Sequence, residues 1–242
     1  MSATRRWWLA ALAGALLLAG VHSWLRHDAG HYLHDDTDSF AAAFAPPPPR
    51  GSAAERAELD ELLALQRART PAEVDAARAD RKTEISRFYG VLGLKDPSAR
   101  LPKTEAIAQS VEDDLRPLVR AAKDRYLRLR PYAVEPRLDP CIANVAADLS
   151  YPSGHSAYGY SMAYLLADMV PERRTQLLGR ADEFARQRMV CGVHFHSDIE
   201  AGRKAAELLM MRLRAAPDFR RDEAGAAAEL RAALQLPALP TG

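Results

Sequence analysis

The sequence has almost no net charge, and this limits what the protein can bind. Its 242 residues include 33 lysines and arginines and 32 aspartates and glutamates, so the formal net charge at pH 7 is +1. Proteins that bind nucleic acid usually present a basic face, and this balance gives no support to that class. Any bound anion must therefore be held locally, by a few placed cations.

Long apolar runs beyond the N-terminus and the alternating pattern of β-strands are also missing. No later segment has the roughly 20 apolar residues that span a bilayer, so we expect no membrane-spanning segment in the mature body. Neither a sustained period of two nor an internal repeat occurs. Apolar residues instead recur at helical spacing through residues 53–242, which predicts one all-α domain, a single helical bundle.

The first residues have the pattern of an export signal. Arg5 and Arg6 precede an uncharged apolar run over residues 7–21, and residues 21–23 offer a cleavage position. We predict a signal peptide over residues 1–23 and a periplasmic protein. The run is shorter than a bilayer span, which favours cleavage; an uncleaved anchor is the alternative. The adjacent arginines also resemble a twin-arginine signal.

Cysteine is scarce, because only Cys141 and Cys191 occur. An even count in an exported protein indicates a disulfide, so we expect these two residues to be bonded to each other. Two buried free thiols are the alternative. The bond would join a loop to a segment 50 residues further along the chain.

Residues 24–52 are predicted to form an extended, proline-rich N-terminal arm. They hold the run Pro46 to Pro49, which favours a polyproline conformation. We expect this arm to wrap over the domain, and a disordered linker is the alternative.

Apolar spacing predicts a series of helices in the domain. Thr70 should cap a helix that has Pro71 in its first turn. Pro117 should kink or divide a later helix, and Pro131 should end it. Residues 132–151 are expected to form a loop. The predicted helices cover residues 55–69, 71–89, 104–127, 156–169, 172–188, 194–215 and 222–234.

Two cations near the middle of the chain form the first candidate cluster. Lys123 and Arg130 are seven residues apart, so on a helix both would point from one face and could hold an anion together. A solvated basic face is the simpler interpretation of such a charge run. We assign Arg125 and Arg128 to a solvated face of this kind.

The second cluster is Pro152-Ser153-Gly154-His155, directly before an apolar helix. Ser153 and Gly154 are typical of a helix start. Free backbone N–H groups there would point at an anion, Gly154 would allow it to come close, and His155 would stand beside it. An ordinary capped helix with an exposed histidine is the alternative.

The third cluster combines Arg188, His194 and Asp198. On a helix, Asp198 can accept a hydrogen bond from Nδ1 of His194 at the i, i+4 spacing, which leaves Nε2 unprotonated and nucleophilic. Arg188 adds a planar guanidinium suited to phosphate oxygens. Taken alone, a histidine–aspartate pair is more often a structural hydrogen bond.

Together the three clusters resemble the three-part signature of the type-2 phosphatidic-acid phosphatase superfamily. The signature reads Lys-x6-Arg-Pro, then Pro-Ser-Gly-His, then Arg-x5-His-x3-Asp, and the whole of it occurs here in order. Agreement at ten fixed positions by chance is negligible. The signal peptide, the proline run, the helical body and Tyr151 before the second motif are similar to the bacterial class A non-specific acid phosphatases. The ten positions are Lys123, Arg130, Pro131, Pro152, Ser153, Gly154, His155, Arg188, His194 and Asp198.

Three residues depart from the pattern of the family. Gln187 stands where the superfamily often has serine, Phe195 where class A enzymes commonly have tryptophan, and His196 where a neutral polar residue is expected. These changes leave the catalytic groups intact and leave substrate preference and pH optimum open.

The resemblance implies a fold, a reaction and a role for each residue. The fold would be the helical bundle of this superfamily and of the vanadium haloperoxidases. His194 would attack phosphorus and form a phosphohistidine, Asp198 would orient it, and His155 would act as acid and then base. Phosphate oxygens would be held by Lys123, Arg130, Arg188 and the amides around Ser153 and Gly154.

No metal or other cofactor is expected, because three cations already supply the positive charge. The histidines at 22, 27, 31 and 34 fit no zinc motif well.

The expected activity is that of an acid phosphatase with many small phosphate monoesters as substrates, including nucleotides and sugar phosphates. Phosphate transfer to alcohols and formation of a homo-oligomer are left open. The alternatives are a lipid phosphate or pyrophosphate phosphatase and a vanadate-dependent haloperoxidase.

Overall fold

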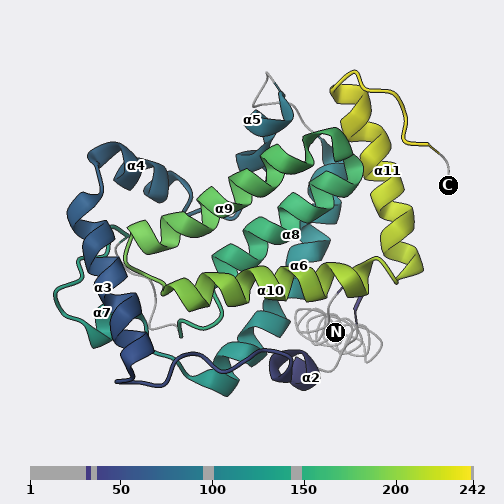
Figure 1. Cartoon of the computed structure of the whole chain (residues 1–242). Coiled ribbons are helices and arrows are strands. Elements are labelled where there is room, and N and C mark those ends of the chain that lie inside the picture. The colour runs from purple at the N-terminus through teal and green to yellow at the C-terminus, as the bar shows by residue number, and fades with distance from the viewer. Residues whose placement is uncertain (1–30, 34–36, 95–100, 143–148, 241–242) are drawn as a thin grey trace, which may run out of the picture.

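The structure is a computed structural model that describes residues 31–33, 37–94, 101–142 and 149–240. The predicted signal peptide, residues 1–23, lies outside these ranges. The described part of the chain contains helices and no strand, which confirms the all-α prediction (Figure 1). The helices are α2 (Thr37–Ala42), α3 (Ala53–Ala68), α4 (Pro71–Ala79), α5 (Tyr89–Leu92), α6 (Pro102–Tyr126), α7 (Pro131–Val134), α8 (Gly154–Met169), α9 (Arg174–Val190), α10 (His196–Leu213) and α11 (Pro217–Ala233). Short 3₁₀ turns cover Ile85–Phe88 and Pro171–Arg173.

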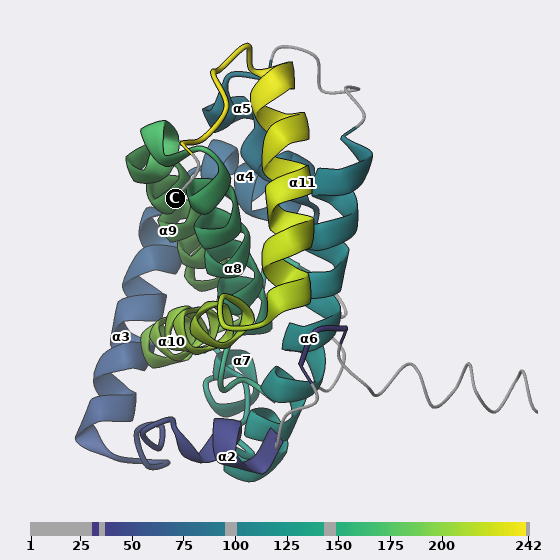
Figure 2. The same ribbon diagram turned by 90° about the vertical axis from the view of Figure 1, so that its right-hand side faces the viewer.

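Helix α8 is the centre of the molecule. It is apolar on all sides, and 13 of its 16 residues are buried, as expected of a helix enclosed by others. It packs against α9 and α10 most extensively and also against α6 and α11. Figures 1 and 2 show these four helices around it. The N-terminus of α8 carries the second sequence motif, so this packing fixes one wall of the candidate site.

A glycine lets α10 approach the start of α8 very closely. A Cβ atom on Gly202 would lie 2.6 Å from the carbonyl oxygen of Ser153 and 2.7 Å from Cβ of Ser156. Real side chains never come this close, so only glycine fits between the two helices. This contact brings the beginning of α10, with the third motif, beside the second motif.

Residues 37–52 of the predicted arm lie against the domain. Phe40 and Phe44 are buried in the main core. Tyr126 Oη donates to the carbonyl oxygen of Phe44 at 2.6 Å, and Tyr151 Oη donates to that of Ala45 at 2.6 Å. The arm is not extended throughout, because Thr37–Ala42 form helix α2.

Several helix ends differ from the predictions. Thr70 caps α4 as expected, with Pro71 at its start, but α4 ends at Ala79 and does not run to residue 89. Of the two outcomes predicted for Pro117, division of the helix does not occur, because α6 is one unbroken helix around it. Helix α6 ends at Tyr126, since Leu127 takes the left-handed conformation at φ 48°. Pro131 begins α7, which extends to Val134 in the predicted loop.

The disulfide between Cys141 and Cys191 is confirmed, with a sequence separation of 50 residues. The backbone N–H of Cys141 also donates to the carbonyl oxygen of Cys191 at 3.2 Å. Closing a loop of this length stabilises a fold by about 4 kcal/mol in a chain-entropy estimate. The bond fixes the segment just before His194.

Candidate active site

The three sequence motifs meet at one pocket of about 550 Å³. Its lining residues come from α6, from Arg130 before α7, from Leu149, from the first turn of α8 and from His194 before α10. Five of the predicted site residues line it: Lys123, Arg130, Gly154, His155 and His194. The remaining lining residues are Arg116, Val119, Arg120, Asp124 and Leu149. The pocket is rich in cations, which suits a multiply charged anion.

The predicted contact between His194 and Asp198 is present, with Nδ1 of His194 3.2 Å from Oδ2 of Asp198. The spacing had suggested that the two residues lie on one helix, but they do not. Helix α10 begins at His196, and Phe195 is its N-cap. Oδ2 of Asp198 also accepts from the backbone N–H of Phe195 at 2.8 Å. Asp198 therefore caps α10 and holds His194 outside the helix.

The tautomer of His194 follows from its second neighbour. Nη1 of Arg130 lies 3.0 Å from Nε2 of His194 and donates to the carbonyl oxygen of Val193 at 2.8 Å. A guanidinium can only donate hydrogen bonds, so Nε2 must be the acceptor and Nδ1 must carry the proton. The nitrogen that faces Arg130 and the pocket thus carries the lone pair of the ring, which accepts a hydrogen bond from Arg130.

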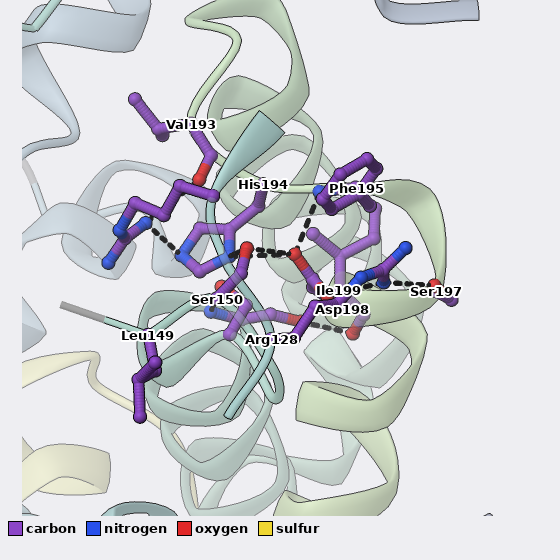
Figure 3. A network of polar contacts seen from close by, with 12 residues as sticks. Arg128, Leu149, Ser150, Val193, His194, Phe195, Ser197, Asp198 and Ile199 are labelled. Carbon is purple, nitrogen blue, oxygen red and sulfur yellow. Dashed lines mark hydrogen bonds and ion pairs between the residues drawn. The ribbon is translucent and has the colours of Figure 1, made fainter. Parts of the chain in front are cut away.

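Ser150 and Arg128 complete the surroundings of Asp198 (Figure 3). The hydroxyl of Ser150 donates to Oδ2 of Asp198 and lies 3.4 Å from Nδ1 of His194. Nη1 of Arg128 donates to Oδ1 of Asp198 at 2.8 Å. Both carboxylate oxygens are therefore held, and Asp198 is fully buried.

The assignment of Arg128 to a solvated face is wrong. Its side chain is buried, and its guanidinium also donates to Glu58 Oε2 and to Ser197 Oγ, each at 2.7 Å. It lies 3.7 Å from the ring centroid of Phe195, which is cation–π geometry. The sequence did not indicate this role, because a buried arginine within a run of charged residues cannot be distinguished from an exposed one. Ser150 left no signal beyond its place directly before Tyr151.

Burial and nearby charge set the protonation of the pair. Burial lowers the pKa of His194, and the cations Arg130 and Lys123 lower it further, against the opposing effect of Asp198. Burial tends to raise the pKa of Asp198, but its bonds to His194 and Ser150 and the charge of Arg128 bring it below its usual value. A neutral imidazole beside a carboxylate is the state that a nucleophile needs.

His155 lies at the first turn of α8 with a partner that the sequence did not predict. Its Nε2 is 2.7 Å from the carbonyl oxygen of Arg81. A carbonyl only accepts, so Nε2 carries a proton and a neutral His155 has its lone pair on Nδ1. Burial lowers the pKa of His155 to about 4, and the charge of Arg188 contributes. In the unliganded site His155 is therefore neutral near pH 6.

Lys123 and Arg130 both reach the pocket, but they do so from different elements. Lys123 is in the last turn of α6, and Arg130 follows in extended backbone as the N-cap of α7. The prediction that one helix presents both is wrong, because α6 ends between them. Nζ of Lys123 donates to the carbonyl oxygen of Leu149. Both side chains are buried and line the pocket.

The amide of Ser153 is not free, contrary to the prediction for this segment. It donates to the carbonyl oxygen of Asp198 at 2.9 Å. The hydroxyl of Ser153 accepts from the N–H of Ser156 and caps α8. Gly154 is the first residue of this segment on the pocket wall. Ser153 therefore joins the two helix starts, and any amide contact to an anion begins at Gly154.

Arg188 is buried and is not among the residues that line the pocket. Its Nη2 donates to the carbonyl oxygen of Ala77 at 2.7 Å, and its Nε has no hydrogen-bond partner in the described part of the chain. Burial lowers its pKa to about 10, and the charge of Arg130 adds to this. Arg188 thus stays charged at neutral and acid pH.

The three departures from the family pattern lie in different surroundings. Phe195 is fully buried under the guanidinium of Arg128. His196 is exposed, with Nδ1 3.3 Å from Oε1 of Glu61. Oε1 of Gln187 is buried and has no hydrogen-bond partner among the described residues. None of these three lines the pocket.

The described ranges hold no group of three histidine, cysteine, aspartate or glutamate side chains that could bind a metal ion. Of the four histidines near the N-terminus, those at 22, 27 and 34 lie outside the described residues. Within the same ranges, no helix is both long enough and apolar enough to cross a bilayer.

The chain is similar to several curated bacterial acid phosphatases. It is 27% identical over 204 residues to a non-specific acid phosphatase of Providencia stuartii, covering 79% of this chain and 81% of that protein. It is 37% identical over 113 residues to a non-specific acid phosphatase of Salmonella typhimurium, covering 46% and 45%. An acid phosphatase of Zymomonas mobilis is 37% identical over 105 residues, covering 42% and 39%. The chain thus spans less than half the length of the latter two relatives.

Two solved structures share the fold at 19% identity. A bacterial vanadium-dependent iodoperoxidase superposes with a TM-score of 0.57 over 73% of this chain and 52% of its own. A transmembrane PAP2-type phosphatidylglycerolphosphate phosphatase from Bacillus subtilis superposes with a TM-score of 0.51 over 74% of this chain and 90% of its own.

Residues 113–221 match the PAP2 superfamily. All three motifs and every predicted catalytic residue fall inside this segment. The match therefore agrees with the pocket, the helical fold and the relatives, and this segment of the chain is similar to the PAP2 superfamily.

Proposed function

We propose that this chain is an acid phosphatase that hydrolyses phosphate monoesters through a phosphohistidine on His194. The observation that carries the proposal is the set of contacts around His194. Asp198 holds its Nδ1, Arg130 faces its lone pair on Nε2, and the cation-lined pocket lies beside it. The curated relatives named as acid phosphatases support the same activity.

In the first step, Nε2 of His194 attacks phosphorus while the bond from phosphorus to the leaving oxygen breaks. Lys123 and Arg130 hold the phosphoryl oxygens, and the buried charge of Arg188 stabilises them from behind. The positive charge that forms on the imidazole is stabilised by Asp198. His155, protonated once the dianion is bound, gives its proton to the leaving oxygen.

In the second step, water attacks the phosphohistidine. His155 is then neutral and takes a proton from this water, so the nitrogen–phosphorus bond breaks and phosphate is released. His194 returns to its neutral form with the proton still on Nδ1. These steps use only side chains of this chain, so a chelator should leave the activity intact.

The substrates that we propose are small phosphate monoesters such as nucleotides and sugar phosphates, handled in the periplasm by a class A type enzyme. Lipid phosphate hydrolysis is the second candidate, because a phosphatidylglycerolphosphate phosphatase shares the fold. Comparing turnover of a soluble monoester with that of a micellar lipid phosphate separates the two. Bromide oxidation with added vanadate tests for a haloperoxidase.

The two histidines can be distinguished by the leaving group. His194→Ala should abolish turnover of every ester and prevent trapping of a phosphoenzyme. His155→Ala should lower kcat/KM for an alkyl phosphate by about 10²–10⁴-fold, because a strongly basic alkoxide needs a proton. A nitrophenyl phosphate releases a stable phenolate, so its kcat/KM should fall far less in this variant.

The measurement is kcat/KM for both esters, with and without EDTA, on variants whose circular dichroism matches the unmodified chain. Equal losses for both esters in His155→Ala, together with residual leaving-group-dependent turnover in His194→Ala, would mean that the roles are reversed. Complete loss of activity in EDTA that a divalent cation restores would contradict the metal-free mechanism.

A further inference from the structure

We infer that the pocket contains a second anion-binding position at Arg120, and that the preferred substrates carry a second anionic group beside the transferred phosphate. This inference rests on the proposed function, because it names the substrate class of the same pocket. It begins from three cations that α6 places along the pocket wall: Arg116, Arg120 and Lys123.

The spacing of these residues forms a row along α6. Positions 116, 120 and 123 lie on one helix face, at the i, i+4 and i+7 spacing. Lys123 is buried at the inner end, whereas Arg116 and Arg120 are exposed. Arg120 is about 4.5 Å from Lys123 along the helix axis, at 1.5 Å per residue. The row therefore leads from the buried phosphate position towards solvent.

Arg120 is the member of the row with capacity for a ligand. Arg116 already pairs with Glu112 at 3.3 Å and with Asp113 at 3.7 Å. Arg120 has no hydrogen bond or ion pair to any described residue. Lys123 contacts a carbonyl group and is placed for the transferred phosphate. An anion one helical turn further out would meet the guanidinium of Arg120 first.

Outside α6, the described lining residues offer no further exposed arginine or lysine. They are Arg130, Leu149, Gly154, His155 and His194, and Arg130 is buried beside His194. Asp124 is the one carboxylate among the described lining residues, and it too lacks an ion-pair partner in the described part of the chain. It partly offsets Arg120, so the attraction for a second anion should grow when Asp124 is neutralised.

The substrate class follows from these positions. The transferred phosphate is held at Lys123, Arg130 and His194, and the rest of the substrate extends along α6 past Arg120. A second phosphate or a carboxylate a few bonds away can then accept hydrogen bonds from the guanidinium, which suits both groups. Bisphosphorylated alcohols and phosphorylated acids are therefore favoured over simple monoesters.

The test uses linear diols of increasing length, each as its monophosphate and its bisphosphate, since both release a similar alkoxide. After correction for two equivalent phosphates, kcat/KM should be higher for the bisphosphates. Arg120→Gln should lower this preference about three- to tenfold, the effect of one exposed charge-assisted contact, while changing monophosphate turnover less than twofold. Asp124→Asn should raise the preference.

Arg125→Gln is the matched control, because Arg125 is exposed on the same helix but does not line the pocket. It should leave the preference unchanged. If monophosphates and bisphosphates are both hydrolysed and Arg120→Gln leaves their ratio unchanged, the second position is overturned while the phosphatase stands. An equal loss on both esters also overturns it. Hydrolysis of neither ester by the unmodified chain refutes the phosphatase itself.

Discussion

Asp198 has two carboxylate oxygens, and each has its own partners. Oδ2 accepts from the Phe195 amide and the Ser150 hydroxyl and contacts His194. Oδ1 accepts from Arg128. Oδ2 thus contacts the nucleophile His194, and the bond from Arg128 to Oδ1 fixes the orientation of the carboxylate. Arg128 is therefore a positioning residue that acts on His194 through Asp198.

Replacing Arg128 should impair catalysis while the pocket cations remain in place. We expect Arg128→Ala to lower kcat/KM about 10- to 100-fold, as for other partners that orient a reacting group from behind. Arg128 also lowers the pKa of Asp198. Without it this pKa rises, so the acid limb of the kcat/KM profile should move to higher pH. The pH profile is the decisive measurement.

Arg125→Ala provides the comparison, since that side chain is exposed three residues away. Arg128→Lys keeps the charge and one contact, and should restore part of the activity and shift the acid limb back. A loss of activity in Arg128→Ala with an unmoved acid limb would indicate a purely structural role.

At this scale the sequence predicted the residues better than their geometry. The motif spacing identified Lys123, Arg130, His155 and His194, and all of them line the pocket. It could not identify Arg128, because a buried arginine and a solvated one have the same local pattern. Arg128 is held by partners far away in the sequence, among them Glu58, 70 residues earlier in the chain.

At the scale of elements, the site depends on the starts of α8 and α10 lying side by side. The Ser153 amide donates to the Asp198 carbonyl, and the hydroxyl of Ser156 donates to the carbonyl of Ile199 at 2.6 Å. Both bonds require the close approach that Gly202 permits. A change at Gly202 should therefore affect both stability and the site.

Gly202→Ala should destabilise the fold by about 1–3 kcal/mol, the usual effect of overpacking a tight contact. The added methyl would meet a backbone carbonyl oxygen, which cannot move as a flexible side chain can. Denaturant unfolding followed by circular dichroism measures the change. Activity should fall as well, because the two helix starts separate.

Gly179→Ala is the matched control, since Gly179 is exposed within α9 and its Cβ would meet nothing within 4 Å. This change should be neutral or stabilising by about 0.5–1 kcal/mol, because alanine is the better helix former. An equally stable Gly202→Ala would contradict the tight contact.

Helix periodicity predicted the main helices, but it did not predict that α4 ends at Ala79 or that α6 ends before Arg130. Helix α6 stops at Tyr126 although no glycine follows, and Leu127 adopts a positive φ. The next residues leave the helix so that Arg128 and Arg130 can reach Asp198 and His194. Long-range contacts of this kind override local propensity, and a local pattern does not contain them.

At the scale of the whole molecule, the site extends beyond the segment that matches the superfamily. Residues 113–221 hold the motifs, but three contacts to them come from earlier in the chain. Glu58 of α3 pairs with Arg128, the carbonyl of Ala77 holds Arg188, and the carbonyl of Arg81 contacts His155. Helices α3 and α4 are thus part of the support of the pocket (Figure 1).

The cations of the pocket also link anion binding to proton binding. The pKa of His155 falls from 6.5 to about 4 on folding, because of burial and nearby positive charge. Between these values the folded protein holds fewer protons at His155 than the unfolded chain, so this group costs stability as pH falls. A bound dianion offsets the cations and raises the pKa of His155 again.

Binding of a dianion should therefore take up a proton. Sulfate is a suitable probe, since it remains doubly charged from pH 5 to 7 while phosphate does not. We expect sulfate affinity to rise as pH falls, up to about tenfold per pH unit between the free and bound pKa values of His155. Calorimetric titration at constant ionic strength, with proton uptake read from buffers of different ionisation enthalpy, measures this.

His155→Ala should keep sulfate binding through Lys123 and Arg130 but lose most of the pH dependence. His194 is the other candidate for the proton, because its pKa is also lowered by burial and by the same cations. Its proton would occupy Nε2 and block attack on phosphorus, so a catalytic site should place the proton on His155. If the pH dependence persists in His155→Ala and disappears in His194→Ala, the proton binds at His194. Binding of the dianion would then protonate the nucleophile His194 and not the general acid His155.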